Sequence, residues 1–193
     1  MDIAELFVPF ITLFVIMDPF ASLPPFLAMT RKYTEKEHAE TANKAVLIAG
    51  ILALVFVFGG MEILKLLSIT LHDFKVAGGI VLALLGLENV LNFSISKEKN
   101  RKDGLESAAV LIATPLLTGP GLISSIIVLV QTYAILPVLI SLFVALFLSW
   151  IILRKATYVK NLLGERVIFI FSKIMGLLLI ALGISYIKYG LAG

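Results

Sequence analysis

The stretch D18-P-F-A-S-L-P-P-F26 interrupts an apolar run that begins at Ile3. Its three prolines and its aspartate stand where the middle of a hydrophobic helix is expected. A proline inside a helix removes a backbone donor and clashes with the carbonyl four residues earlier, which costs about 3 kcal/mol. The stretch therefore predicts a break in an apolar helix, and the surrounding sequence decides whether that helix crosses a membrane.

The composition is that of a polytopic membrane protein. Of 193 residues, 60% are hydrophobic and 15% are charged, and the mean hydropathy is +1.04. A soluble domain carries about 25% charged residues. The chain has no cysteine and only two histidines, so we expect no disulfide, no metal site and no cofactor. The N-terminus is acidic where a signal peptide is basic, so the first apolar run is predicted to be a retained span.

Six apolar runs are long enough to cross the hydrocarbon core of a bilayer, which takes about 20 helical residues. They cover residues 6–30, 44–67, 73–93, 108–131, 134–153 and 167–189. The connections between them are short and leave no room for a soluble domain. We therefore expect an all-α integral membrane protein with six transmembrane helices, forming a single polytopic domain over residues 1–193.

Lysine and arginine predict how these helices are oriented. Twelve of the sixteen lie in the connections after the first, third and fifth runs, whereas Lys65, Lys75 and Lys188 lie on the opposite side. Because cytoplasmic loops carry the excess of positive charge, we expect these three basic loops in the cytoplasm. Both termini would then lie outside the cell (inner or plasma) membrane. Lys173, near the start of the last run, can extend its stem toward the basic side.

An internal repeat relates the two halves of the chain. A shift of 96 residues places D18-P-F-A-S-L-P-P-F26 over T114-P-L-L-T-G-P-G-L122. The matched pairs are Pro19 with Pro115, Ser22 with Thr118 and Pro24 with Pro120. A shift of 97 places F74-K-V-A-G-G-I-V-L-A-L-L-G86 over F171-S-K-I-M-G-L-L-L-I-A-L-G183. The first run therefore resembles the fourth, and the third resembles the sixth.

Each repeat, about residues 1–95 and 105–193, holds three spans. Because three is odd, the second copy enters the membrane from the opposite side, which makes the repeats inverted. The first and fourth helices are then broken at corresponding points near mid-membrane. Inverted repeats with matched breaks are the sequence pattern that best predicts a transporter's midplane site.

The two breaks would present backbone groups as ligands. We expect the first half-helices to end near Met17 and Ala113, with free carbonyls, and the second to start near Pro24 and Pro120, with free N–H groups. Broken backbone survives in a membrane only against protein or a watery cavity. N–H groups at a helix start favour a carboxylate, and carbonyls or an acid favour an ammonium. The pair therefore suits a small zwitterion.

The candidate substrate-binding residues are Asp18, Pro19, Ser22, Pro24, Thr114, Pro115, Thr118, Gly119, Pro120 and Gly121. Asp18 is the only acid predicted at midplane depth, where a carboxylate is costly and usually functional. It can pair with a substrate ammonium, take up a coupling proton or cap neighbouring backbone. Gly119 and Gly121 allow a ligand to approach the backbone closely. Glu88 and Asn89 either line an inner vestibule and take part in coupling or lie at the membrane interface.

The motifs D18-P-F-A-S-L-P-P-F-L-A-M-T30 and A113-T-P-L-L-T-G-P-G-L-I123 resemble the paired signatures of the MarC family, also described as six-span neutral amino acid transporters. The resemblance covers essentially the whole chain. One departure is Ala21-Ser22, where the family often has glycine-asparagine. The resemblance implies transport of small neutral amino acids such as glycine or alanine, coupled to a proton or sodium gradient.

Other functions remain open on the residues alone. A passive channel or an exporter of another small solute would need no different sequence features. An integral membrane enzyme acting on lipid would need a His/Asp, Ser/His or metal cluster, so we do not expect an enzyme. The expected partners are a small zwitterionic substrate, a coupling ion and the lipid bilayer, without nucleic acid. The apolar, glycine-lined faces are also compatible with a homodimer.

Overall fold

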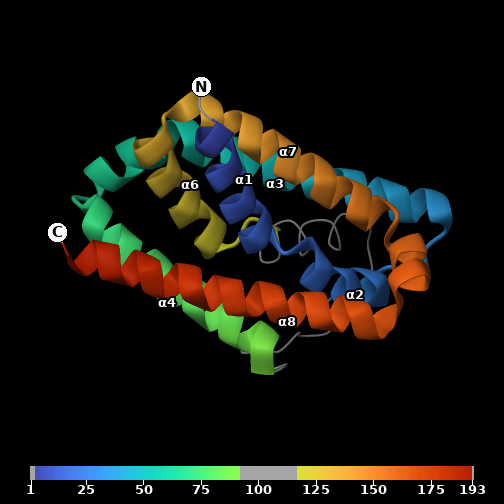
Figure 1. Ribbon diagram of the computed structural model, residues 1–193. Coiled ribbons are helices and arrows are strands. Elements are labelled where there is room, and N and C mark those ends of the chain that lie inside the picture. The colour runs from blue at the N-terminus through green and yellow to red at the C-terminus, as the bar shows by residue number, and fades with distance from the viewer. Residues whose placement is uncertain (1–2, 92–116, 193) are drawn as a thin grey trace.

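The computed structural model describes residues 3–91 and 117–192 (Figure 1). Every regular element in these residues is a helix: α1 (Ile3–Met17), α2 (Pro19–Met29), α3 (Glu35–Leu66), α4 (Leu71–Leu91), α6 (Pro120–Tyr133), α7 (Ile135–Arg154) and α8 (Ala156–Leu191). Five segments are long and apolar enough to cross a membrane, namely α1 with α2, α3, α4, α7 and α8, and α6 is a shorter apolar helix. The start of the predicted fourth span, with Thr114 and Pro115, lies outside the described residues.

Helices α3 and α8 begin well before the apolar runs that predict them. Helix α3 starts at Glu35, ahead of residue 44, because Thr34 supplies a capping box with Glu37. The Thr34 N–H donates to the Glu37 carboxylate at 2.7 Å, and the Thr34 hydroxyl accepts from the Glu37 N–H at 3.3 Å. Helix α8 starts at Ala156, but Gly164 interrupts it with a left-handed backbone (φ 77°, ψ 158°). The helix after Gly164 therefore corresponds to the predicted run 167–189.

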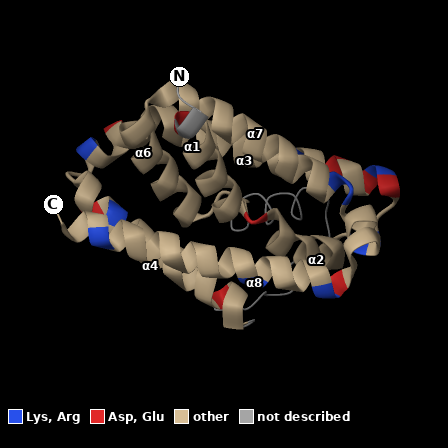
Figure 2. Ribbon diagram, viewed as in Figure 1, with Lys and Arg blue, Asp and Glu red and all other residues tan. Residues whose placement is uncertain are grey.

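Most charged residues gather at two opposite ends of the bundle, and the ribbon between them is largely uncharged (Figure 2). This distribution is what a membrane requires, because a charge in hydrocarbon is costly. One exception in the described residues is Asp18, which is only 4% exposed.

Helices α1, α2 and α6 lie between the α3–α7 pair and the α4–α8 pair (Figure 1). Helix α1 packs on α6 and α7, and the Ser141 hydroxyl of α7 donates to the Leu6 carbonyl of α1 at 2.8 Å. Helix α2 packs on α7 and α8. The α1–α2 junction and the start of α6 are therefore enclosed by helices rather than exposed to lipid.

Helices α4 and α8 pack backbone to backbone through glycines. A Cβ atom at Gly79 would lie 2.6 Å from the Gly183 carbonyl oxygen, and one at Gly86 would lie 2.5 Å from the Gly176 carbonyl oxygen. Small residues allow such close approach of membrane helices. Because Gly79 meets Gly183 while Gly86 meets Gly176, the two helices run antiparallel.

Candidate functional site

Asp18 separates α1 from α2. Its backbone is left-handed (φ 35°, ψ 67°), a conformation that aspartate and asparagine adopt more readily than most non-glycine residues. Its carboxylate accepts the Ala21 N–H at 3.1 Å and so caps α2. Pro19 follows at the first helical position, where its missing N–H is not needed. The Asp-Pro pair therefore ends one helix and begins the next.

The expectation that the second half-helix starts near Pro24 is wrong. Asp18 supplies both the turn and the cap, so the helix resumes at Pro19, and Pro24 and Pro25 lie inside α2. Ser22 is likewise within the helix, where it is buried and its hydroxyl donates to the Asp18 carbonyl at 3.1 Å. Since proline has no N–H, Pro24 and Pro25 cannot donate to the carbonyls four residues earlier.

The Asp18 carboxylate is held by α4 as well as by α2. The Asn89 side-chain amide, in the last turn of α4, donates to the second carboxylate oxygen at 2.8 Å. The Lys173 amine of α8 in turn donates to the carbonyls of Asn89 at 2.7 Å and Val90 at 2.5 Å. None of the ion pairs among the described residues involves Asp18. The site is thus a buried carboxylate bonded to amides rather than to a cation.

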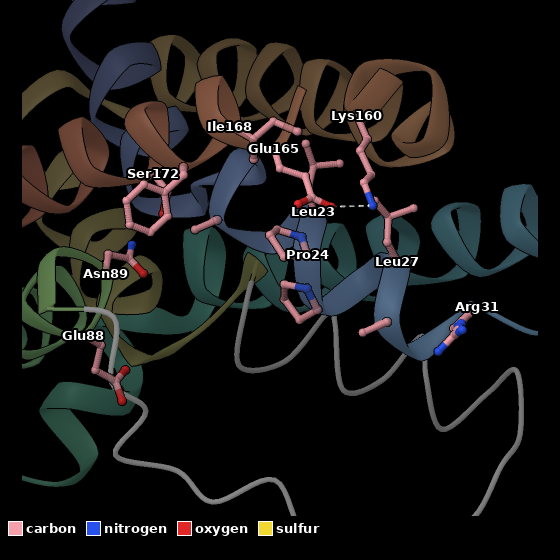
Figure 3. A pocket seen from close by; sticks show the side chains of 14 residues that line it. Leu23, Pro24, Leu27, Arg31, Glu88, Asn89, Lys160, Glu165, Ile168 and Ser172 are labelled. Carbon is pink, nitrogen blue, oxygen red and sulfur yellow. Dashed lines mark ion pairs between the residues drawn. The ribbon is translucent and has the colours of Figure 1, made fainter. Parts of the chain in front are cut away.

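A cavity of about 850 Å³ lies between α2, the end of α4 and the first part of α8 (Figure 3). Its lining includes Ala21, Pro24, Pro25, Arg31, Glu88, Asn89, Lys160, Glu165 and Ser172. Lys160 and Glu165, both in α8, form an ion pair of 2.8 Å on its wall. Asn89 therefore faces the cavity and also bonds Asp18, which connects the carboxylate to this space.

The second predicted break lies at the start of α6. This helix begins at Pro120, as expected, and Gly119 precedes it with an extended backbone (φ −65°, ψ 173°). Thr118 is buried, with 2% of its surface exposed. A Cβ atom at Gly121 would lie 2.7 Å from Leu82 Cδ2. The close neighbour of position 121 is therefore a side chain of α4.

A second, smaller cavity of about 290 Å³ lies between α3, α4 and α6. The lining side chains are mainly apolar, and those from α6 are Pro120, Ile123, Ser124 and Ile127. The repeat shift of 96 places these four residues over Pro24, Leu27, Ala28 and Arg31, all of which line the large cavity. The two cavities are therefore lined in part by residues that the shift of 96 aligns, three of which lie in α2.

The sequence predicted roles for Asp18 and Asn89 but not the hydrogen bond between them, and it predicted no partner for Lys173. Sequence spacing does not predict contacts between residues this far apart in the chain. The only signal for Lys173 was its charge inside an apolar run.

Apolar helices long enough to span a membrane, enclosing one buried carboxylate, define the class as a multi-pass integral membrane protein. The sequence profile of the MarC family of integral membrane proteins matches residues 3–193, and the chain belongs to this family.

Three relatives give the extent of the similarity. A UPF0056 membrane protein of Aquifex aeolicus is 33% identical over 94% of this chain and 90% of its own length. The UPF0056 membrane protein YhcE of Escherichia coli is 33% identical over 95% of this chain and 90% of its own length. A Methanocaldococcus jannaschii member is 32% identical over 100% and 98%, respectively. No solved structure matches the chain significantly.

Proposed function

We propose that the chain is a secondary transporter for small neutral amino acids such as glycine and alanine, coupled to a proton or sodium gradient. The observation that carries this proposal is the buried Asp18 carboxylate, which contacts the wall of a large cavity through Asn89 at 2.8 Å. A buried carboxylate without an ionic partner is costly. A substrate ammonium or a coupling cation arriving through the cavity would neutralise it.

The start of α6 would receive the other end of the substrate. Helices α1 and α6 pack against each other, and the positive end of the α6 dipole at Gly119 and Pro120 favours a carboxylate. Gly119 has no side chain to occupy this end. The buried hydroxyl residues Ser22 and Thr118 stand at equivalent positions of the two repeats. A zwitterion bound here would join the two halves of the chain.

The packing of α4 on α8 supports two inverted three-helix repeats. The shift of 97 makes Gly79 equivalent to Gly176 and Gly86 equivalent to Gly183. The contact of Gly79 with Gly183 then maps onto the contact of Gly176 with Gly86, and both contacts occur. These two contacts exchange under a two-fold axis that relates α4 to α8. The same operation exchanges the α4–α6 packing with the α2–α8 packing, and both are present.

The paired cavities support alternating access around this axis. The large cavity reaches Arg31 and Lys160, which belong to the basic segments after the first and fifth apolar runs, proposed to be cytoplasmic because of their charge. Its smaller equivalent faces the side of both termini, which we propose is outside the cell membrane. In this proposal the conformation described is open inward and closed outward, and Glu88 and Asn89 line the inner vestibule.

Uptake of labelled glycine and alanine into proteoliposomes tests the proposal. We expect saturable uptake that an imposed proton or sodium gradient accelerates, together with counterflow from preloaded vesicles. The control is the Asp18→Asn variant in matched liposomes. Absence of saturable uptake and counterflow for both amino acids would overturn the proposal. Flux without saturation or counterflow would instead indicate a passive channel.

A further inference from the structure

We propose that Lys173 is a positioning residue for this site: it holds Asn89 against Asp18, so that the Asn89 amide stands between the large cavity and the carboxylate. The inference rests on the proposed function for its consequence on transport. The contacts that carry it involve α8, which contributes no residue to the substrate site expected from the sequence.

Lys173 binds the last described turn of α4. The carbonyls of Asn89 and Val90 lie in this turn. The Lys173 amine donates to both, at 2.7 Å and 2.5 Å. The lysine therefore anchors the turn that carries the Asn89 side chain.

Gly176 determines how closely that turn approaches α8. A Cβ atom at Gly176 would lie 2.8 Å from the Asn89 Cβ and 3.1 Å from Val90 Cγ2. Lys173 and Gly176 are three residues apart and lie on the same face of α8. Lys173 thus binds the Asn89 backbone, and Gly176 leaves room for the Asn89 side chain.

The Asn89 side chain binds the Asp18 carboxylate and lies between it and the cavity. Its amide donates to Asp18 at 2.8 Å and lines the cavity. The other carboxylate oxygen accepts the Ala21 N–H at 3.1 Å. A cation that enters from the cavity therefore meets Asn89 before it reaches Asp18. If the hydrogen bonds from Lys173 to the Asn89 and Val90 carbonyls are lost, Asn89 moves more freely and the carboxylate becomes more accessible.

The repeat separates this polar contact from ordinary helix packing. The shift of 97 places Gly176 over Gly79, so the packing glycine occurs in both halves. The same shift places Lys173 over Val76 and Asn89 over Tyr186. The related pair of positions, Val76 and Tyr186, thus has neither the amine nor the amide, although the glycine is kept. Helix packing therefore requires the glycine and not the lysine, which favours a role for Lys173 at the carboxylate.

A substrate-independent experiment is available because the chain has no cysteine. Ala21→Cys introduces a single thiol on the cavity wall next to Asp18. Its rate of labelling by a membrane-impermeant maleimide, added on the side of the basic loops, reports how open the cavity wall beside Asn89 and Asp18 is. We expect Lys173→Met to raise this rate severalfold and Lys173→Arg to keep it near the starting value. Lys188→Met, at an exposed position of the same helix, is the matched control.

An unchanged labelling rate in a correctly folded Lys173→Met variant would overturn the proposal, and so would an equal increase for Lys188→Met. Folding is checked by size-exclusion chromatography in detergent. If Lys173→Met does not give a monodisperse protein, Lys173→Gln replaces it, with the same expected direction and the same criterion.

Transport kinetics provide the second readout. We expect Lys173→Met to raise KM for glycine uptake severalfold with little change in the maximal rate. In an Asn89→Ala background the same substitution should add nothing, because the effect passes through Asn89. Additive effects of the two substitutions would overturn the proposal. If the unsubstituted chain takes up neither glycine nor alanine, the proposed function fails, and the labelling experiment still decides the role of Lys173.

Discussion

The side-chain amide of Asn89 donates a hydrogen bond of 2.8 Å to the carboxylate of Asp18, although the two residues are 71 positions apart in the chain. The bond ties the end of α4 to the junction between α1 and α2. It also gives the buried carboxylate a partner whose other face lines a cavity. This arrangement leads to the predictions that follow.

Asp18→Asn should abolish most glycine uptake while the protein keeps its fold. Asparagine tolerates the left-handed backbone and can cap a helix, but it has no charge for an ammonium or a proton. Asp18→Ala should in addition destabilise the protein by about 1–3 kcal/mol, because it loses the cap and strains the turn. Uptake assays and thermal unfolding in detergent separate the two effects. Uptake at the level of the unsubstituted chain by Asp18→Asn would make Asp18 a structural residue.

Gly86→Ala should weaken the packing of α4 on α8. Its Cβ would lie 2.5 Å from a backbone oxygen, and overpacking of this kind costs typically about 1–3 kcal/mol. Gly59→Ala is the control, because a Cβ there meets nothing within 4 Å. Alanine is the better helix former, so that variant should be as stable as the unsubstituted chain or slightly more stable. Equal melting temperatures for the two variants would contradict the backbone contact.

Gly119→Leu should lower the affinity for glycine. The backbone of Gly119 is extended (φ −65°, ψ 173°), so leucine can adopt it without strain. The new side chain would occupy space at the start of α6 where we propose that the substrate carboxylate binds. Competition binding or KM measurements check this, with melting temperature as the control for folding. An unchanged affinity would remove the start of α6 from the site.

Single cysteines at Leu27 and Ile123 should respond to glycine in opposite directions. The sequence shift of 96 aligns the two positions, which line the large and the small cavity, respectively. We expect Leu27→Cys to be labelled from the side of the basic loops before glycine is added, and less so during glycine exchange. Ile123→Cys should gain reactivity from the other side during exchange. Reactivity that rises or falls together at both positions would contradict alternating access.

Much of the helical organisation was readable from hydropathy. The runs 134–153 and 73–93 correspond to α7 and α4, and the predicted starts differ from the observed ones by one or two residues. The early starts of α3 and α8 lie in polar segments, where capping by Thr34 and a glycine turn decide the boundary instead of hydrophobicity. The start of α2 was misplaced at Pro24 because three prolines compete for the first helical position. The left-handed turn at Asp18 selects Pro19.

The sequence by itself determined the class, the family and most of the helices. A membrane helix satisfies its own backbone hydrogen bonds, so its presence depends on local composition, and the D-P and G-P motifs are local too. Only the tertiary structure decided that Asn89 meets Asp18 and that Lys173 holds Asn89. These contacts join three helices that are distant in sequence. Their geometry depends on the glycine-mediated approach of α4 to α8, which no single segment contains.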